Sequence, residues 1–222
     1  MQTKLAITIM LALIILSTLG GILLMPQLPP QMASHWNAAD QVDGTMSRFW
    51  GVFLMPLITL FMMVLFLIIP TIDPMAENIK RFRGTFNTFI VLTVGFMVYI
   101  YWLTLLYNLG YSFALSQLML PALGVLFFAA GSLVEKAQPN WFIGIRTPWT
   151  LSNPVVWEKT HHLGGILFKV AGGLTFLSVL AGKEAFWVCI TTIMIAALVP
   201  TIYSYLLFQN LQRGRDNPKR TK

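Results

Sequence analysis

Six long apolar runs constrain this chain more than any other feature of its sequence. They cover residues 5–25, 51–70, 85–107, 115–134, 163–181 and 185–208. Each is close to the roughly 20 residues that an α-helix needs to cross the ~30 Å hydrocarbon core of a bilayer. The runs are continuously apolar, without the polar alternation of a membrane barrel strand, and this favours helices. The sequence therefore predicts an all-α fold, a polytopic membrane bundle of six transmembrane helices.

The composition supports a membrane protein. Of the 222 residues, 56% are apolar and only 10% are charged, whereas a soluble domain carries about 25% charged residues. The net charge of +7 could indicate nucleic-acid binding, but the cations lie between the apolar runs and near the C-terminus. We therefore expect a lipid bilayer as the partner and no direct nucleic-acid contact. Leu5 to Met25 shows no good cleavage site, so we expect an uncleaved first span.

The distribution of Lys and Arg predicts the orientation, because short cytoplasmic loops carry the excess of these residues. If the N-terminus is cytoplasmic, the outer segments hold only Arg48 and Lys183. The cytoplasmic segments then hold the other cations outside the spans: Lys4, Lys80, Arg81, Arg83, Lys136, Arg146, Lys159, Arg213, Arg215, Lys219, Arg220 and Lys222. Both termini are therefore predicted to be cytoplasmic.

Two polar segments on opposite sides of the membrane suggest how the chain is divided. We expect an N-terminal two-span unit at 1–84, with an outer loop at 26–50. A C-terminal four-span unit would follow at 85–222, with a cytoplasmic loop at 135–162 and a basic tail at 209–222. Lys and Arg near anionic lipid contribute about 1 kcal/mol each, so we expect the tail to contact the membrane surface.

The outer loop contains four candidate site residues. Its prolines favour extended or turn geometry, and the Asp-Gly pair at 43–44 is a turn signal. Imidazole and carboxylate groups can hold a divalent metal, so three of the four are weak metal candidates, although their spacing fits no defined site. The alternative is a hydrogen-bonded loop in which Asp and Asn side chains form turns. The four residues are His35, Asn37, Asp40 and Asp43, and Asn37 is the one outside the metal set.

The cytoplasmic loop leads into the fifth span. Asn153 as N-cap and Pro154 at the first helical position predict a helix start there. On this helix Trp157 and His161 are four residues apart, as are Glu158 and His162, so each pair lies on one face. The second pair could do acid–base or metal chemistry, but no third ligand is near. The alternative is an interfacial helix start, and we expect no cofactor and no enzymatic activity.

Two cations call for separate explanations. Arg146 would cost about 2.5–3.5 kcal/mol at mid-bilayer, so we expect it at the interface, where it pairs with phosphate or bonds backbone carbonyls. Lys169 lies inside the fifth span, on a face shared with glycines at 165, 172 and 173. Such faces let membrane helices pack closely. Lys169 then either points into the bundle as an intramembrane functional group or extends toward the inner headgroups.

The cytoplasmic loop closely resembles the signature loop of the SdpI (sporulation-delay-protein immunity) family. It reads Asn140-Trp-Phe-Ile-Gly-Ile-Arg-Thr-Pro-Trp149, then Thr-Leu-Ser-Asn and, after two residues, Val156-Trp-Glu-Lys-Thr-His161. The positions that carry the resemblance, and that we take as a binding or signature site, are Asn140, Gly144, Arg146, Thr147, Pro148, Trp149, Trp157 and His161.

The outer loop also resembles a small domain of unestablished function that often forms the N-terminal half of this family. The matching residues are Pro30, His35-Trp-Asn37, Asp43-Gly44 and Ser47-Arg48. One departure is Asp40, which stands where the pattern prefers glycine. Aspartate tolerates a left-handed backbone better than most residues, so the turn can survive this change.

The resemblance implies a six-span protein of the bacterial cytoplasmic membrane that protects the cell from a secreted peptide toxin. Some family members also hold an autorepressor at the membrane. The implied partners are thus a peptide toxin on the outer face and a repressor on the inner face. Lys169 and the glycine faces motivate a transporter or channel as an alternative. A metal-dependent membrane enzyme, motivated by the His and acidic residues, is a second alternative.

Overall fold

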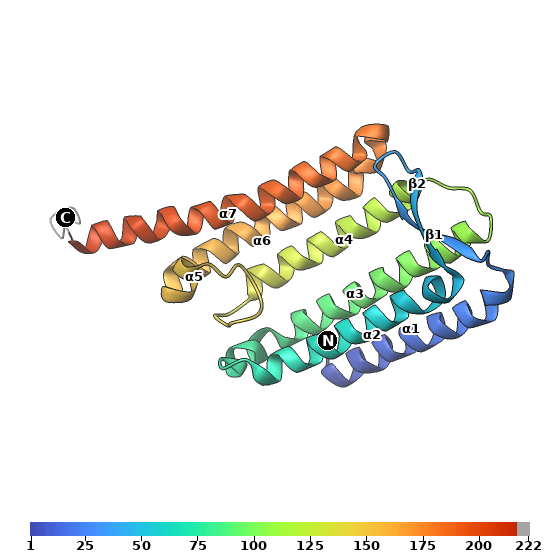
Figure 1. Ribbon diagram of the computed structural model, residues 1–222. Helices are drawn as coiled ribbons and strands as arrows, with labels where there is room; N and C mark the ends of the chain where they lie inside the picture. Colours follow the sequence, from blue (N-terminus) through green and yellow to red (C-terminus); the bar gives the residue numbers. More distant parts are fainter. Residues whose placement is uncertain (217–222) are drawn as a thin grey trace.

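Six long helices dominate the computed structural model, which describes residues 1–216. They lie side by side, as Figure 1 shows. Their bounds are α1 Thr3–Leu24, α2 Arg48–Ile72, α3 Ala76–Asn108, α4 Leu115–Lys136, α6 Pro154–Leu177 and α7 Ala185–Asp216. Short elements complete the described chain: the 3-10 helices η1 (Met25–Gln27) and η2 (Ser178–Glu184), the short helix α5 (Pro148–Ser152) and two strands. Lys219, Arg220 and Lys222 of the predicted basic tail lie outside the described residues.

Five stretches of the described chain are long and apolar enough to cross a membrane. They are Thr3–Gln27, Arg48–Ile72, Ala76–Asn108, Leu115–Lys136 and Pro154–Gly214. The last stretch contains both α6 and α7, joined through η2. The protein is therefore predominantly helical, as the apolar runs predicted, and the predicted spans fall on the observed helices.

The expectation of an exclusively α-helical chain was wrong in one region. Strands β1 (Gln31–Trp36) and β2 (Val42–Ser47) form an antiparallel hairpin inside the predicted outer loop. Gln31 pairs with Ser47 and Trp36 with Val42, with register irregularities around His35. These six-residue strands lack a regular apolar alternation, because part of one face packs on the helices and the rest is exposed. The sequence therefore gave only turn signals.

The hairpin and the signature loop lie at opposite ends of the bundle (Figure 1). We call these the hairpin end and the loop end. Residue 1 and the C-terminal end of α7 both lie toward the loop end. The terminal amino group of Met1 donates a hydrogen bond to the carbonyl of Gly84, at 3.2 Å. The proposed division of the chain at residue 84 stays a prediction.

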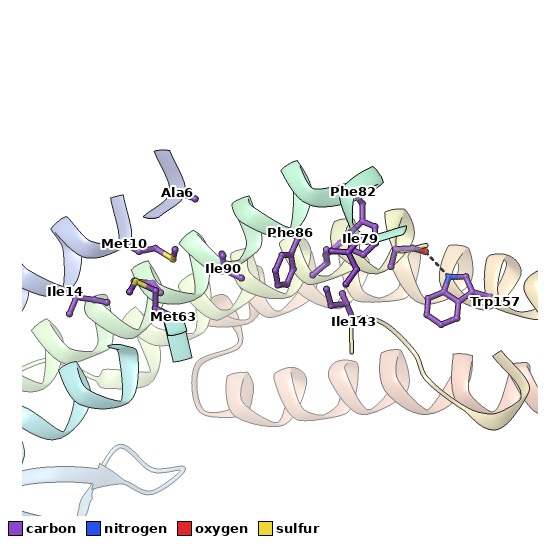
Figure 2. Close-up of a cluster of buried hydrophobic side chains, with 13 residues drawn as sticks. Ala6, Met10, Ile14, Met63, Ile79, Phe82, Phe86, Ile90, Ile143 and Trp157 are labelled. Carbon is purple, nitrogen blue, oxygen red and sulfur yellow. Dashed lines mark hydrogen bonds between the residues drawn. The ribbon is translucent and has the colours of Figure 1, made fainter. Parts of the chain in front are cut away.

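A buried core joins α1, α2 and α3 to the start of the signature loop. Figure 2 shows Met10 from α1, Met63 from α2 and Phe86 from α3 in one apolar cluster. Ile143 and Trp157, which belong to the signature loop, lie in the same cluster. The core therefore fixes the loop against the N-terminal helices.

Glycines bring α4 and α6 into backbone contact. A Cβ atom on Gly131 would lie 2.7 Å from the carbonyl oxygen of Gly165 and 2.7 Å from the amide nitrogen of Lys169. A Cβ on Gly124 would lie 2.6 Å from the carbonyl oxygen of Gly172. Both distances are far below van der Waals contact, so no larger residue fits without separating the helices. The glycine face predicted for the fifth span therefore packs on α4 through Gly165 and Gly172, but not through Gly173, where a Cβ would meet no atom within 4 Å.

Candidate functional site

Asn140 organises the first turn of the signature loop. Its side chain is 0% exposed. The amide oxygen accepts hydrogen bonds from the backbone N–H groups of Phe142 (2.9 Å) and Ile143 (2.6 Å). The amide nitrogen donates to the carbonyls of Gln138 and Ile143, both at 2.8 Å. Two backbone carbonyls need a donor here and two backbone N–H groups need an acceptor. The asparagine side chain provides both, through its NH₂ group and its oxygen.

His161 links α6 to the middle of the loop. Its ring is 1% exposed and stacks on Trp157, with ring centroids 3.9 Å apart. The Nε2 atom accepts the backbone N–H of Ile145 at 3.0 Å, and Nδ1 lies 2.8 Å from the carbonyl oxygen of Trp157. A carbonyl only accepts, so these partners assign the proton to Nδ1 and leave Nε2 as the acceptor. Neutral His161 thus serves as a structural clamp on the loop.

Gly144 is required by both its backbone and its surroundings. Its φ angle is +113°, in the region that side chains disfavour. A Cβ atom here would collide with Nε2 of His161 and lie 3.0 Å from Cδ2 of the same ring. Glycine at 144 therefore lets the loop approach the imidazole closely enough for the next residue, Ile145, to bond it.

The short helix α5 is anchored on α7. Thr147 caps α5 by accepting the N–H of Thr150 at 3.1 Å, and Pro148 occupies the first turn. The Thr147 hydroxyl also lies 3.0 Å from the hydroxyl of Ser204 on α7. The ring of Trp149 packs on Tyr205, with centroids 5.0 Å apart. The Thr-Pro-Trp part of the signature thus forms a cap and a contact to the last helix.

Arg146 is exposed and folds the loop through a backbone contact. Its guanidinium donates a hydrogen bond to the carbonyl of Trp141, five residues earlier. This is the second of the two alternatives that the sequence left open for this residue. The bond leaves part of the five-donor guanidinium free, and Trp141 itself is exposed.

The loop is also fastened to the turn between α2 and α3, which sequence reasoning missed. Asp73 is 4% exposed, and its carboxylate accepts the N–H groups of Trp141 (2.9 Å) and Met75 (2.7 Å). The side-chain amide of Asn78 donates to the carbonyl of Pro139 at 2.8 Å. The available signal was Asp73 itself, a carboxylate directly at the end of an apolar run.

Lys169 pairs with the C-terminal end of α4. Its ammonium lies 2.8 Å from one carboxylate oxygen of Glu135, and the other oxygen lies 3.6 Å from Nδ1 of His162. The side chains of Lys169 and Glu135 are 27% and 30% exposed. His162 thus faces Glu135, and no ion pair joins it to Glu158 among the described residues. Lys169 therefore neither stands free in the bundle nor extends alone to headgroups.

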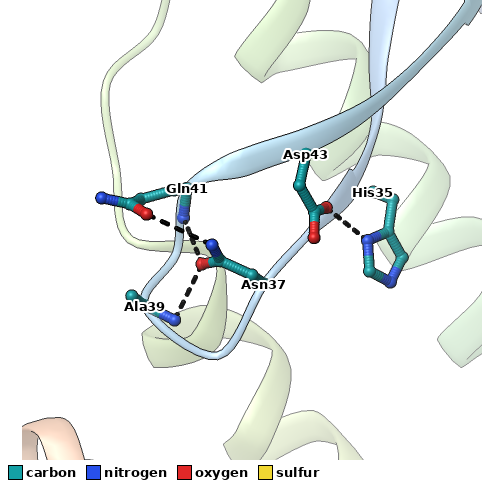
Figure 3. Close-up of polar contacts among 5 residues, drawn as sticks. All are labelled: His35, Asn37, Ala39, Gln41 and Asp43. Atoms are coloured by element: carbon teal, nitrogen blue, oxygen red, sulfur yellow. Dashed lines mark hydrogen bonds and ion pairs between the residues drawn. The ribbon is translucent and has the colours of Figure 1, made fainter.

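The hairpin separates the predicted metal candidates into two contacts. His35 and Asp43 bond each other across the strands, and the Asn37 side chain accepts the N–H groups of Ala39 and Gln41 to shape the turn (Figure 3). Asp40 instead contacts α4. Within residues 1–216, no group of three or more His, Cys, Asp or Glu side chains is arranged to hold a metal ion.

Asp40 fastens the hairpin tip to the start of α4. Its φ angle of 57° shows the left-handed backbone that the glycine of the family pattern would adopt. One carboxylate oxygen accepts the N–H of Ser116 at 2.8 Å, and the other accepts the Ser116 hydroxyl. Asp40 thus caps α4 from another segment of the chain. A second fastening, also missed from the sequence, joins the Asn108 side chain to the backbone N–H and carbonyl of Ala33, at 2.7 and 3.0 Å.

Comparisons with known proteins agree with both loop resemblances. Residues 136–204 match the SdpI/YfhL protein family, and residues 12–60 match a domain of unknown function (DUF1648). The chain is 25% identical over 208 residues to the Immunity protein SdpI of Bacillus subtilis (strain 168), covering 93% of this chain and 98% of that protein. No solved structure matches the chain. The matches show that the chain is similar to the SdpI family over residues 136–204 and to one immunity protein along most of its length, and the apolar helices indicate a membrane protein.

Proposed function

We propose that this protein is an immunity protein of the bacterial cytoplasmic membrane that protects its cell from a secreted peptide toxin. The observation that carries the proposal is the similarity to an immunity protein over 93% of the chain. The fold is consistent with it, since every position of the signature loop named above contributes a contact or a turn to one folded unit at the loop end. Similarity supports the protective role, and we propose that it depends on the residues that fold the signature loop.

We further propose six spans with both termini in the cytoplasm. The stretch Pro154–Gly214 has 61 residues, and as one straight helix it would extend about 90 Å at 1.5 Å per residue. This is about three times the bilayer core. Gly182, with φ 58° and ψ −125°, breaks the stretch between α6 and α7, which lie side by side (Figure 1). Residue 1, the C-terminal end of α7 and the signature loop lie toward one end, and the predicted cytoplasmic segments hold most of the cations.

In this orientation the hairpin faces the exterior and the signature loop faces the cytoplasm. The hairpin is then placed to meet a toxin that arrives from outside. The signature loop presents three exposed residues: Trp141, Phe142 and Arg146. Such a mixed surface suits a soluble protein partner, and we propose that a cytoplasmic repressor docks there when toxin is bound.

The experiment that tests immunity is survival of a toxin-sensitive strain that expresses this chain. We expect wild-type protein to protect against the cognate secreted peptide. Asn140→Asp and Trp149→Ala should reduce protection at equal membrane abundance, whereas Arg213→Ala on the exposed end of α7 should not. Survival unchanged by expression of the wild-type chain would refute the immunity role.

A separate measurement addresses the repressor. The candidate repressor should co-sediment with membranes that contain wild-type protein and toxin, and less with membranes that contain a Trp141→Ala, Phe142→Ala variant. Immunity that persists without any co-sedimentation would remove the signalling part of the proposal and leave the protective part. No specific observation favours the transporter or the metal-enzyme alternative. Lys169 is paired with Glu135, and the metal candidates of the hairpin are divided between two separate contacts.

A further inference from the structure

A hollow of about 350 Å³ lies where the hairpin tip meets the hairpin ends of α4, η2 and α7. Figure 1 shows this junction, with the hairpin turn beside the connection from α6 to α7. The hollow is therefore formed between the N-terminal and C-terminal parts of the chain, and neither part makes it alone. The residues that matter for its chemistry are Ala39, Asp40, Ser116, Leu120, Lys183 and Phe186.

The wall of the hollow is fixed before any ligand arrives. Asp40 is bonded to both the backbone N–H and the hydroxyl of Ser116, so the hairpin tip is held over α4. Below it, Leu120 is 1% exposed and packs with Ala185 and Cys189 in a small buried cluster. A closed apolar floor and a fastened rim are the properties of a largely preformed ligand site, and the volume lies at the lower end of the usual ~300–1,000 Å³.

The hollow is lined by one anionic and one cationic side chain, Asp40 and Lys183. Both carboxylate oxygens of Asp40 are engaged by Ser116. Lys183 has no salt bridge to any residue within 1–216, and its side chain lines the mouth of the hollow. The other outer cation, Arg48, donates its Nε–H to the carbonyl of Pro29. Lys183 is therefore the cation available to an anionic ligand at this end, whereas the Asp40 carboxylate keeps its negative charge but directs its oxygens to Ser116.

We propose that this hollow binds the C-terminal end of an extracytoplasmic peptide, with an apolar last residue on Leu120 and Phe186 and the free carboxylate at Lys183. A chain end fits better than an internal segment, because the floor is closed and an internal segment would have to turn back. An ammonium meets a carboxylate in a charge-assisted hydrogen bond. The inference rests on the proposed orientation, and it gives the proposed immunity a specific ligand chemistry.

The test uses the full-length chain in phosphatidylcholine nanodiscs and a fluorescent hexapeptide that ends in Leu-Leu. Three forms of the probe are titrated: the free acid, the C-terminal amide and a free acid that ends in Ser-Ser. We expect the Leu-Leu acid to bind, and both other forms to bind several-fold more weakly. Equal binding of acid and amide would overturn the carboxylate assignment, and equal binding of the Leu-Leu and Ser-Ser acids would overturn the apolar floor.

Matched variants locate the binding. Lys183→Gln should weaken binding of the acid by roughly threefold to tenfold, in the range of a charge-assisted contact near a surface, and leave the amide unchanged. Glu184→Gln, at the adjacent exposed residue outside the lining, is the control and should not weaken it. Ala39→Trp at the exposed hairpin tip should block the hollow without disturbing the buried floor. Acid binding unchanged in both Lys183→Gln and Ala39→Trp would refute the site.

The outcome is separable from that of the immunity proposal. Peptide binding is measured without any toxin, so binding can be found even if expression gives no protection. In that case the site stands and the toxin is removed as the source of its peptide. If protection is found and the Leu-Leu acid does not bind, this site is refuted and the immunity proposal is unaffected.

Discussion

Replacing Gly144 by alanine tests whether the signature loop depends on the contact with His161. A side chain at φ +113° costs about 1–2 kcal/mol through backbone strain. The new Cβ collides with Nε2 of His161, so the ring must move and the 3.0 Å bond to the Ile145 N–H is lost. An unsatisfied buried group costs a further ~1–3 kcal/mol. Together, these two costs should lower the free energy of local opening of the loop by about 2–5 kcal/mol.

Hydrogen–deuterium exchange of the loop in detergent or nanodiscs measures this change directly. The amide of Ile145 should exchange at least about 30-fold faster in Gly144→Ala, because 1.4 kcal/mol corresponds to tenfold. Gly173→Ala is the control, since a Cβ at that helical position meets no atom within 4 Å. It should leave exchange at Ile145 unchanged. If both variants exchange at the wild-type rate, the steric argument and the clamp role of His161 are wrong.

Three further predictions follow from other contacts of the site. Asn140→Asp removes two donors from buried carbonyls and buries a charge, so it should lower thermal stability strongly, by several kcal/mol; a melting temperature like that of wild type would contradict the four-bond geometry. Gly131→Ala places a Cβ 2.7 Å from two backbone atoms of α6, and should reduce disulfide cross-linking between cysteines introduced on α4 and α6, whereas Gly95→Ala, which has open space, should not. In a double-mutant cycle, Lys169→Ala and Glu135→Ala should show a coupling of at most about 1 kcal/mol, because the pair is about one-third exposed; a coupling of 3 kcal/mol or more would show a water-excluded pair.

The sequence predicted the parts of this structure that depend on local pattern. Apolar length located the helices, and the Asn153-Pro154 pair predicted the start of α6, where the Asn153 side chain accepts the N–H groups of residues 155 and 156. The glycine spacing predicted a close helix interface but not the partner of that interface. The partner is α4, whose own glycines lie about 40 residues earlier in the chain.

The parts that could not be predicted depend on contacts between distant segments. Asp73 bonds residue 141 and Asn78 bonds residue 139, across 68 and 61 residues. Asp40 bonds Ser116 across 76 residues. Spacing placed His161 on the same helix face as Trp157, yet its role is set by the N–H of Ile145. A single sequence contains these polar residues but no signal that pairs them.

Helix α4 connects the two ends of the molecule, because it makes polar contacts at both of them. At the hairpin end Asp40 holds Ser116 in the first turn of α4, and at the loop end Glu135 holds Lys169. These two points on α4 are 19 residues apart, or roughly 29 Å along one helix. Between them, backbone contact at the glycines prevents α4 from sliding freely on α6. A ligand that displaced the hairpin tip would therefore act first on α4, and then on the partly exposed ion pair, the weaker of its two links. The sequence suggested Lys169 as a functional group by itself, whereas its contact with Glu135 places it at the far end of a series of contacts that begins at Asp40.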